Sequence, residues 1–319
     1  MVKIRAIDLF CGAGGSSWGA RSAGVEIVAG FDMWETARNA YQDNFPQARV
    51  YGGRLEDVDL AAVKAEMGEI NLILASPECT NHSPAKGNRP RCEASKATAF
   101  QVTRFAREFC PRWVVVENVV SMRRWTRYAE FLAELGSLGY KVSEQVLNAA
   151  DFGVPQRRRR LLILCDREAE PSKMAPTVKR RKPASRIIDR NGTYRYSPLL
   201  TERRAEATLQ RANRALAALG PNVAFLLVYY GSDGGGGWQR LDRPLRTITT
   251  LDRFALVKPD PEHGHVMRML QVPELRAAMG MPRSFSFRHG TRRDKIGMIG
   301  NAVCPKVMQA VVTALCTEG

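Results

Sequence analysis

The stretch Asp8-Leu9-Phe10-Cys11-Gly12-Ala13-Gly14-Gly15 decides how the first half of this chain folds. The run that begins at Arg5 predicts a strand, and the glycines after it let the backbone turn tightly and approach a ligand closely. Asp32 comes 20 positions after Gly12, where a carboxylate can accept hydrogen bonds from ribose hydroxyls. Ser17 stands where a dinucleotide-binding turn has its third glycine, so the pattern favours another adenosine ligand. A purely structural turn is the alternative.

Strand-like and helix-like segments alternate through residues 1–168. The strand-like runs are 5–10, 25–31, 70–75, 113–116 and 161–165. This alternation predicts an α/β fold with a mostly parallel sheet and helices on both faces. Residues 169–272 lose the regular alternation and predict a smaller second domain. Residues 273–300 predict a hinge, and residues 301–319 a helix that returns to the first domain.

Composition narrows the class of protein. The 319 residues carry a net charge of +16, and an excess of this size favours a polyanionic partner, nucleic acid ahead of a membrane. A solvated basic surface is the alternative. No run approaches the roughly 18 apolar residues of a membrane span, and we expect no signal peptide. The seven scattered cysteines contain no Cys-x-x-Cys pair, which predicts a cytoplasmic protein without disulfides and without a zinc site.

Cys79 follows the apolar run 70–75, in the turn Ser76-Pro77-Glu78-Cys79-Thr80. A short apolar run closed by a proline turn predicts a buried strand that ends at the sheet edge where open α/β folds bind ligands. A free thiol in such a place is commonly an inert, packed side chain. The polar segment 81–91, which carries a lysine and two arginines, predicts instead a basic loop that closes over a bound polyanion.

Two further strand ends carry charged side chains. Glu117 follows three valines, and a buried glutamate is costly unless it is paired or functional. Partial burial would raise its pKa and let it hold or give a proton near neutrality; capping the next helix is the alternative. Farther along, strand alternation places Gln156, Arg158 and Arg160 on one face. A basic surface patch is the alternative for this run.

Together and in this order, these segments resemble those of the cytosine-C5 DNA methyltransferases. The matching segments are 8–15, the cysteine turn, Glu117-Asn118-Val119, Gln156-x-Arg158-x-Arg160, 243–250, 274–282 and Gly300-Asn301-Ala302-Val303. Several segments in the family's order are far more specific than any one of them. The resemblance implies an S-adenosylmethionine-dependent methyltransferase fold with a Rossmann-like sheet. It leaves residues 169–240 unmatched, where the family carries its variable target-recognition domain.

The resemblance also implies how this chain would bind S-adenosylmethionine. Phe10 would stack near the adenine, and the turn at Gly12 and Gly14 would lie under the methionine part. Asp32 would take the ribose hydroxyls, and Asn301 would close the pocket from the C-terminal segment. The remaining residues that the resemblance places at the cofactor are Asp8, Gly15, Met33, Pro77 and Val303.

The catalytic residues implied by the resemblance are Cys79, Glu117 and Arg158. Cys79 would add to C6 of cytosine, which makes C5 nucleophilic enough to accept a methyl group. Glu117 would grip the base at N3 and the exocyclic amine, and Arg158 would hold the pyrimidine carbonyl. The base must flip out of the duplex at a cost of a few kcal/mol, and phosphate contacts of the basic loop would offset that cost.

The turn around the nucleophile departs from the family's usual Pro-Cys-Gln, because Glu78 and Thr80 flank Cys79. A carboxylate beside a thiol raises the thiol pKa by like-charge repulsion. We therefore hypothesise that Glu78 points away from the thiol and contacts the cofactor or the base.

Two other departures concern the adenosine part of the cofactor site. Arg54 stands where the family often has an aspartate that reads the adenine amine, and Glu56 or Asp57 are the candidates to replace it. Met33 stands where the family frequently has a tryptophan; Trp34 is adjacent but would face the other way.

The sequence thus predicts an S-adenosylmethionine-dependent cytosine-C5 methyltransferase that acts on double-stranded DNA. We expect a monomer on DNA, in a prokaryotic or phage-infected cytoplasm and associated with the nucleoid; a cognate restriction endonuclease is a candidate partner. One alternative keeps the scaffold but methylates tRNA. The other is a catalytically weak DNA-binding protein, an idea that the altered cysteine turn motivates.

Overall fold

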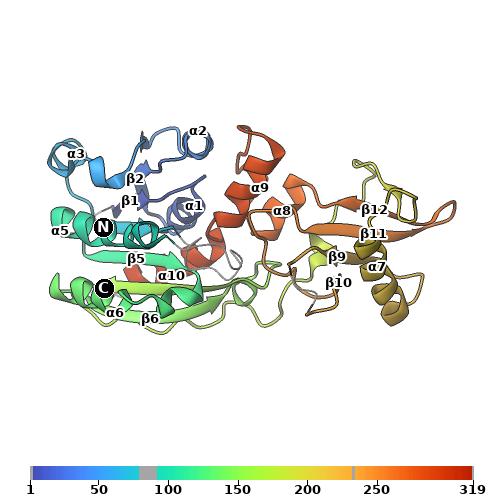
Figure 1. Cartoon of the computed structure of the whole chain (residues 1–319). Helices are drawn as coiled ribbons and strands as arrows, with labels where there is room; N and C mark the ends of the chain where they lie inside the picture. The colour runs from blue at the N-terminus through green and yellow to red at the C-terminus, as the bar shows by residue number, and fades with distance from the viewer. Residues whose placement is uncertain (1–2, 79–91, 232–233, 318–319) are drawn as a thin grey trace.

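The computed structural model describes residues 3–78, 92–231 and 234–317, which form two lobes joined side by side (Figure 1). The larger lobe is built on a sheet in which seven strands lie in the order β3-β2-β1-β4-β5-β7-β6 within the described residues. The strands are β1 (Arg5–Leu9), β2 (Glu26–Phe31), β3 (Arg49–Tyr51), β4 (Leu72–Ala75), β5 (Trp113–Asn118), β6 (Lys141–Asn148) and β7 (Arg159–Asp166). The first five in that order run parallel, and β7 is antiparallel to both of its neighbours. The α/β prediction is confirmed.

Helices cover both faces of this sheet. They are α1 (Gly15–Ser22), α2 (Glu35–Asn44), α3 (Leu60–Met67), α4 (Glu93–Ala97), α5 (Phe100–Phe109), α6 (Tyr128–Ser137) and α10 (Pro305–Thr317). One core cluster joins α1, α2 and α10 to one face, and another joins α3, α5 and α6 to the opposite face. Strand side chains alternate between the clusters, so the strands are buried on both sides, as parallel strands require.

Short 3-10 helices connect several of these elements. They are Leu55–Asp57, Val120–Arg124, Ala149–Phe152 and, in the smaller lobe, Ala184–Arg186.

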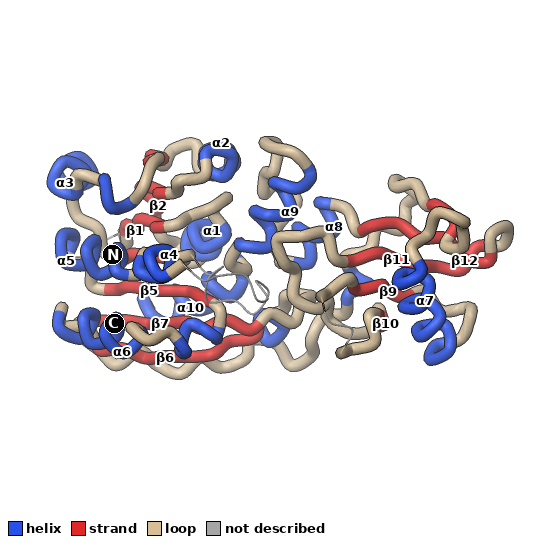
Figure 2. Tube along the Cα trace, in the orientation of Figure 1, coloured by secondary structure: helices blue, strands red, loops and turns tan. Residues whose placement is uncertain are grey.

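The smaller lobe contains a second, antiparallel sheet in the order β10-β9-β11-β12-β8 (Figure 2). Its strands are β8 (Ser197–Pro198), β9 (Phe225–Val228), β10 (Trp238–Arg240), β11 (Phe254–Asp260) and β12 (Gly264–Met269), and its helix is α7 (Glu206–Leu219). Ala212 and Ala215 of α7 pack on one face, against Phe225 and Leu227. The other face belongs to the same core cluster as α1 and α10, so apolar packing is continuous between the lobes.

The chain returns to the larger lobe through α8 (Val272–Ala278) and α9 (Arg292–Asn301). The segment Arg292–Cys316 is long and apolar enough to span a membrane, but 56% of its most apolar window is buried inside the molecule. The helix is also interrupted between Asn301 and Pro305. We therefore interpret it as a pair of core helices.

Candidate functional site

The glycine-rich turn joins β1 to α1 at the carboxyl edge of the parallel strands. Gly14 has a φ of 95°, in the left-handed region that favours glycine. Close packing requires Gly15, because a Cβ there would lie 2.4 Å from the carbonyl oxygen of Val303. A Cβ on Gly12 would meet no atom of the described residues within 4 Å. The turn thus packs tightly against the C-terminal segment at one end and is open at the other.

Asp8, on β1, holds the start of α1 just after this turn. It is fully buried, and its Oδ2 accepts hydrogen bonds from the Ser17 hydroxyl (2.6 Å) and the Ser17 backbone N–H (3.2 Å). Burial raises the pKa of Asp8 to about 7. The Ser17 hydroxyl is also 2.8 Å from that of Tyr41, so the serine at the third-glycine position links strand, turn and α2. Asp8 is not among the residues that line the pocket described next.

A pocket of about 260 Å³ opens beside the turn. Its lining comes from the ends of β1, β2 and β4, from the loop after β3 and from α4; the residues are Phe10, Asp32, Met33, Gly53, Arg54, Leu55, Glu56, Glu78, Cys92, Ser95 and Thr98. Phe10 has a φ of 57°, and backbone strain of this kind clusters at ligand sites. The Met33 side chain is 71% exposed. Three residues predicted to bind cofactor, Phe10, Asp32 and Met33, therefore come together here.

Asp32 both holds the turn and faces the pocket. Its two carboxylate oxygens accept backbone hydrogen bonds from Gly12 and Trp34, each at 2.8 Å. Burial raises the pKa of Asp32, and these two hydrogen bonds oppose the rise. Each oxygen keeps a second lone pair that a ligand hydroxyl can use.

Val303, Asn301 and Pro77, which are also predicted to bind the cofactor, are not among the described residues that line the pocket. Val303 is buried against Gly15, and Asn301 is exposed at the end of α9. Pro77 is buried, and its carbonyl accepts a hydrogen bond from the Asn118 side chain at 3.1 Å. Of the two candidates for the adenine contact, Glu56 lines the pocket and Asp57 does not.

Glu117 forms a second charged cluster at the end of β5. It is buried, and its Oε1 lies 3.0 Å from Nε of Arg160 on β7. Burial raises the pKa of Glu117, and the positive charges of Arg160 and Arg158 oppose the rise. The neighbouring Asn118 holds the Pro77 carbonyl, so the carboxylate stands beside the segment that leads to Cys79. Cys79 itself lies outside the described residues.

The two inward-facing arginines have different surroundings. The Arg158 guanidinium donates to the carbonyls of Ile248 (3.0 Å), Gly300 (2.8 Å) and Ala302 (3.0 Å). Arg158 therefore connects two later segments of the chain, the one around Ile248 and the one from Gly300 to Ala302, to the start of β7. The resemblance implies that Arg158 holds the base; in the structure Arg160 is the arginine in ion-pair contact with Glu117. The signal that favours Arg160 is present in the sequence, because strand alternation puts it on the same face.

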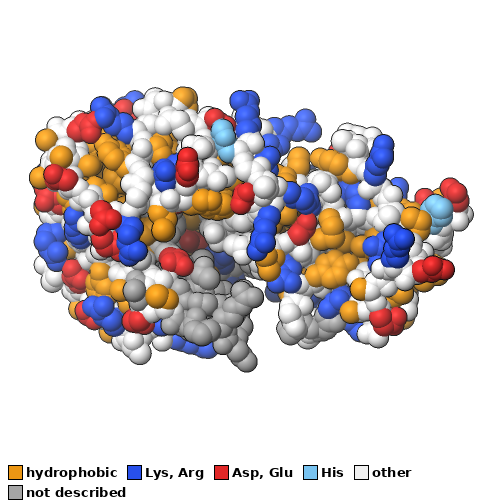
Figure 3. Space-filling model, turned by 45° about the horizontal axis from the view of Figure 1, so that its top comes forward, with side chains coloured by type: hydrophobic (Ala, Val, Ile, Leu, Met, Phe, Trp, Pro, Cys, Tyr) orange, Lys and Arg blue, Asp and Glu red, His pale blue; other side chains and the backbone are white. Residues whose placement is uncertain are grey.

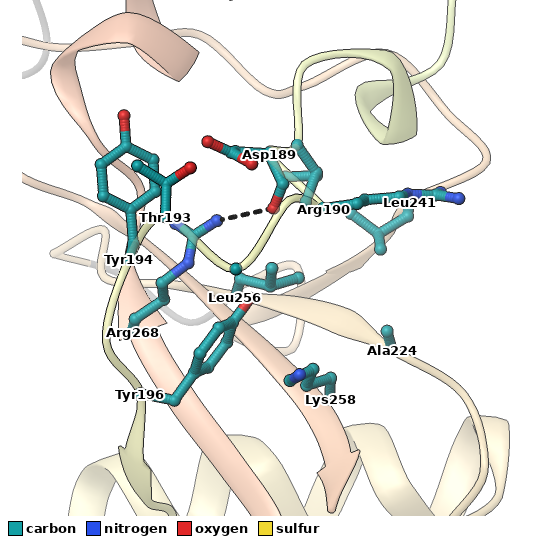
Figure 4. Close-up of a pocket in the computed structure, with 12 residues that line it drawn as sticks. Asp189, Arg190, Thr193, Tyr194, Tyr196, Ala224, Leu241, Leu256, Lys258 and Arg268 are labelled. Atoms are coloured by element: carbon teal, nitrogen blue, oxygen red, sulfur yellow. Dashed lines mark hydrogen bonds between the residues drawn. The ribbon is translucent and has the colours of Figure 1, made fainter.

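A second pocket, of about 270 Å³, lies in the smaller lobe (Figure 4). Tyr194 and Tyr196 flank Arg268, whose guanidinium carbon is 5.1 and 5.2 Å from their ring centres. Arg268 also makes two bonds of 2.7 Å to Glu274, and Lys258 lies 4.5 Å from the Tyr196 ring centre. On the surface, lysines and arginines are spread over both lobes (Figure 3).

Comparison with known proteins gives one consistent family. The model of the C-5 cytosine-specific DNA methylase family matches residues 4–317. A Type II methyltransferase of Herpetosiphon aurantiacus, M.HgiDI, is 28% identical over 326 residues, covering 98% of this chain and 94% of the relative. M.HindV of Haemophilus influenzae is 28% identical over 322 residues, covering 98% and 96%.

Solved structures have the same fold. A methyltransferase of Entamoeba histolytica superposes with a TM-score of 0.72 at 16% identity, covering 100% of this chain and 99% of that one. The Dnmt2 methyltransferase of S. pombe gives 0.68 at 15% identity, covering 99% of both chains. At these identities, the likeness extends to the fold alone.

Proposed function

Because the chain belongs to the C-5 cytosine-specific DNA methylase family and is a DNA cytosine-C5 methyltransferase, we propose that it methylates a flipped cytosine through a covalent bond between Cys79 and C6. The family and the fold imply S-adenosylmethionine as methyl donor. The observation that carries the proposal is the buried pair of Glu117 and Arg160 at 3.0 Å, beside the segment that enters Cys79. Such a pair offers both a proton and a positive charge to one edge of a pyrimidine.

The residues around the first pocket fit an adenosine ligand. Phe10 and the exposed Met33 offer apolar surface to a flat ring, and Asp32 offers acceptors to a diol. Glu56 is the carboxylate placed to accept from an exocyclic amine. When bound there, S-adenosylmethionine supplies an electrophilic methyl group.

The protein's own residues would prepare the base. The Cys79 thiolate adds its electron pair to C6, the C5–C6 π electrons become available at C5, and negative charge develops toward N3. Glu117, whose pKa burial raises, holds a proton toward N3 and stabilises that charge. Arg160 keeps Glu117 in place and presents the rest of its guanidinium to the ring carbonyl. After methyl transfer, loss of the C5 proton to a base returns the electrons and expels the thiolate.

Trapping on 5-fluorocytosine tests this mechanism, since fluorine at C5 cannot be removed as a proton. Duplex DNA in which every cytosine is 5-fluorocytosine should give a denaturant-resistant adduct that requires S-adenosylmethionine. Cys79→Ala should abolish the adduct. Cys110→Ser, a change at an exposed thiol outside both pockets, should keep it. Absence of an adduct with the unaltered protein, together with normal methyl transfer by Cys79→Ala, would refute the covalent route.

We further propose that residues 169–272 select the DNA sequence and that the enzyme acts on duplex DNA as a monomer. Its relatives are named Type II methyltransferases, which supports a restriction endonuclease as genetic partner. Parallel methyl-transfer assays on duplex DNA and tRNA distinguish the DNA enzyme from a tRNA enzyme, and a protein that only binds DNA would be inactive on both. Bisulfite sequencing of DNA from cells that express the protein would reveal the recognised site.

A further inference from the structure

Glu78, the residue before the proposed nucleophile, faces the first pocket. It lines that pocket together with Phe10 and Asp32. Its Oε2 accepts a hydrogen bond of 2.5 Å from the hydroxyl of Ser95 on α4. The serine therefore fixes one oxygen of the carboxylate at the pocket wall. Within the described parts of the chain, no residue donates a hydrogen bond to the other oxygen, Oε1.

The charge of this pocket is opposite to that of the whole chain. The protein carries +16, yet among the described residues the lining contains three carboxylates, those of Asp32, Glu56 and Glu78, and one guanidinium, that of Arg54. Arg54 lies 3.8 Å from Glu56 and balances that carboxylate. The two oxygens of Asp32 already accept backbone hydrogen bonds. Glu78 is thus the carboxylate with the most capacity left for a ligand, and such a group favours a cation.

The proposed reaction puts a cation close to Glu78. Cytosine C5 and C6 are bonded to each other, so a thiol at C6 and a methyl donor at C5 approach adjacent atoms. Glu78, the residue before that thiol, lines the pocket proposed for the methyl donor, so its carboxylate is available to the sulfur that carries the methyl group. Before transfer this sulfur is a positively charged sulfonium, and after transfer it is an uncharged thioether.

We propose that Glu78 contacts the methyl donor and makes the pocket prefer the charged sulfonium form, S-adenosylmethionine, over the uncharged product, S-adenosylhomocysteine. This inference rests on the proposed function. It gives the carboxylate a role at a position where the family usually has proline. A preference of this kind helps the spent product to leave, because its affinity falls when the charge is lost.

Titration calorimetry of the two compounds into the full-length protein tests the proposal without any turnover. Glu78→Gln keeps the shape of the side chain and its bond to Ser95 but removes the charge. It should raise the Kd for S-adenosylmethionine about tenfold, equivalent to about 1.4 kcal/mol, and the Kd for S-adenosylhomocysteine about twofold or less. Ser95→Ala removes the hydrogen bond that holds the Glu78 carboxylate. It should raise the Kd for S-adenosylmethionine relative to that for S-adenosylhomocysteine, but by a smaller factor than Glu78→Gln.

Glu56→Gln is the matched control. It removes a carboxylate from the same pocket, but at the position proposed for the adenine amine, which both compounds share. It should weaken both to the same degree and leave their ratio unchanged. Equal Kd changes for both compounds in Glu78→Gln, or none, would overturn the role of Glu78 while leaving the methyltransferase proposal intact. If the unaltered protein binds neither compound, the proposed cofactor site itself is wrong.

Discussion

At the scale of single residues, burial raises the pKa of two acids that have different tasks. Asp8 and Glu117 are both buried, and desolvation raises the pKa of each. Asp8 supports the glycine turn through the two hydrogen bonds that its Oδ2 accepts from Ser17. Glu117 is placed to use its raised pKa, because Arg160 holds it at the strand end next to the segment leading to Cys79.

Asp8 should make stability depend on pH. Its folded-state pKa of about 7 lies above the usual 3.8, so its contribution is fully present below pH 4 and is lost as the pH rises through 7. At about 1.4 kcal/mol per pKa unit, ionising Asp8 costs up to about 4 kcal/mol. Asp8→Asn should therefore flatten the dependence of urea-unfolding free energy on pH between about 4 and 7. An unchanged slope would mean that Asp8 ionises without cost in the folded protein.

Glu117→Gln should separate base chemistry from cofactor binding. The amide keeps the shape of the side chain but can no longer deliver a proton, so adduct formation on 5-fluorocytosine DNA should slow by about 10² to 10⁴. The Kd for S-adenosylhomocysteine should stay within about twofold, because Glu117 does not line the first pocket. Adduct formation at the original rate would remove Glu117 from the mechanism.

At the scale of elements, two arginines at the start of β7, Arg158 just before the strand and Arg160 within it, have separate tasks. Arg158 joins β7 to three carbonyls in later segments, whereas Arg160 pairs with Glu117. Arg158→Ala should cost about 3–5 kcal/mol of unfolding free energy, because buried charge-assisted hydrogen bonds are lost.

Arg160→Ala should leave the unfolding free energy nearer that of the unaltered protein but slow adduct formation at least tenfold. Arg159→Ala, at an exposed position on the same strand, is the control that should change neither. If Arg158→Ala is stable but inactive and Arg160→Ala is active, the assignment of the two arginines is reversed.

Gly15→Ala tests the contact between α1 and the C-terminal segment. The added Cβ would lie 2.4 Å from the Val303 carbonyl oxygen, and overpacking of this kind costs about 1–3 kcal/mol. Gly136→Ala in α6 is the matched control, because a Cβ there meets no described atom within 4 Å. It should stabilise the protein by up to about 1 kcal/mol, since alanine favours helix. Both free energies can be measured by urea unfolding.

How much the sequence predicted depends on how local each signal is. The glycine turn, the strand-end position of Glu117 and the mostly parallel sheet follow from patterns a few residues long. Arg158 and Arg160 share one face by alternation, and their different partners, at Gly300 and Glu117, depend on the tertiary fold. For the same reason the role of Ser17, which bonds to Asp8 and Tyr41, has no local signature.

At the scale of the whole molecule, positive charge is spread over both lobes (Figure 3), whereas the described lining of the first pocket carries more carboxylates than guanidinium groups. This separation lets one protein attract a polyanion broadly and still bind a cationic small molecule. The smaller lobe contains a run of four glycines, residues 234–237. Arg246 donates a hydrogen bond of 3.0 Å to the carbonyl of Gly235 in this run.

Arg246→Ala should weaken duplex binding and reduce the slope of log K against log salt by about one. The cause would be the loss of one phosphate contact, and fluorescence anisotropy across a salt series measures both quantities. Arg127→Ala is the control and should leave the slope unchanged. Arg127 directly precedes α6 and forms an ion pair with Glu130 of that helix. Equal slopes for the two variants would place Arg246 outside the DNA contact.

The packing of α10 beside α1 has a consequence for how the protein folds while it is being synthesised. Gly15 packs against Val303, and Gly19 packs against Pro305 and Met308, so the glycine turn is synthesised long before the segment that packs on it. At about 5–20 residues per second, this interval lasts on the order of tens of seconds. Until then the nascent chain lacks the partner of its cofactor turn. Chains that terminate before α10 should therefore be unable to modify DNA, and activity begins only after α10 has been synthesised.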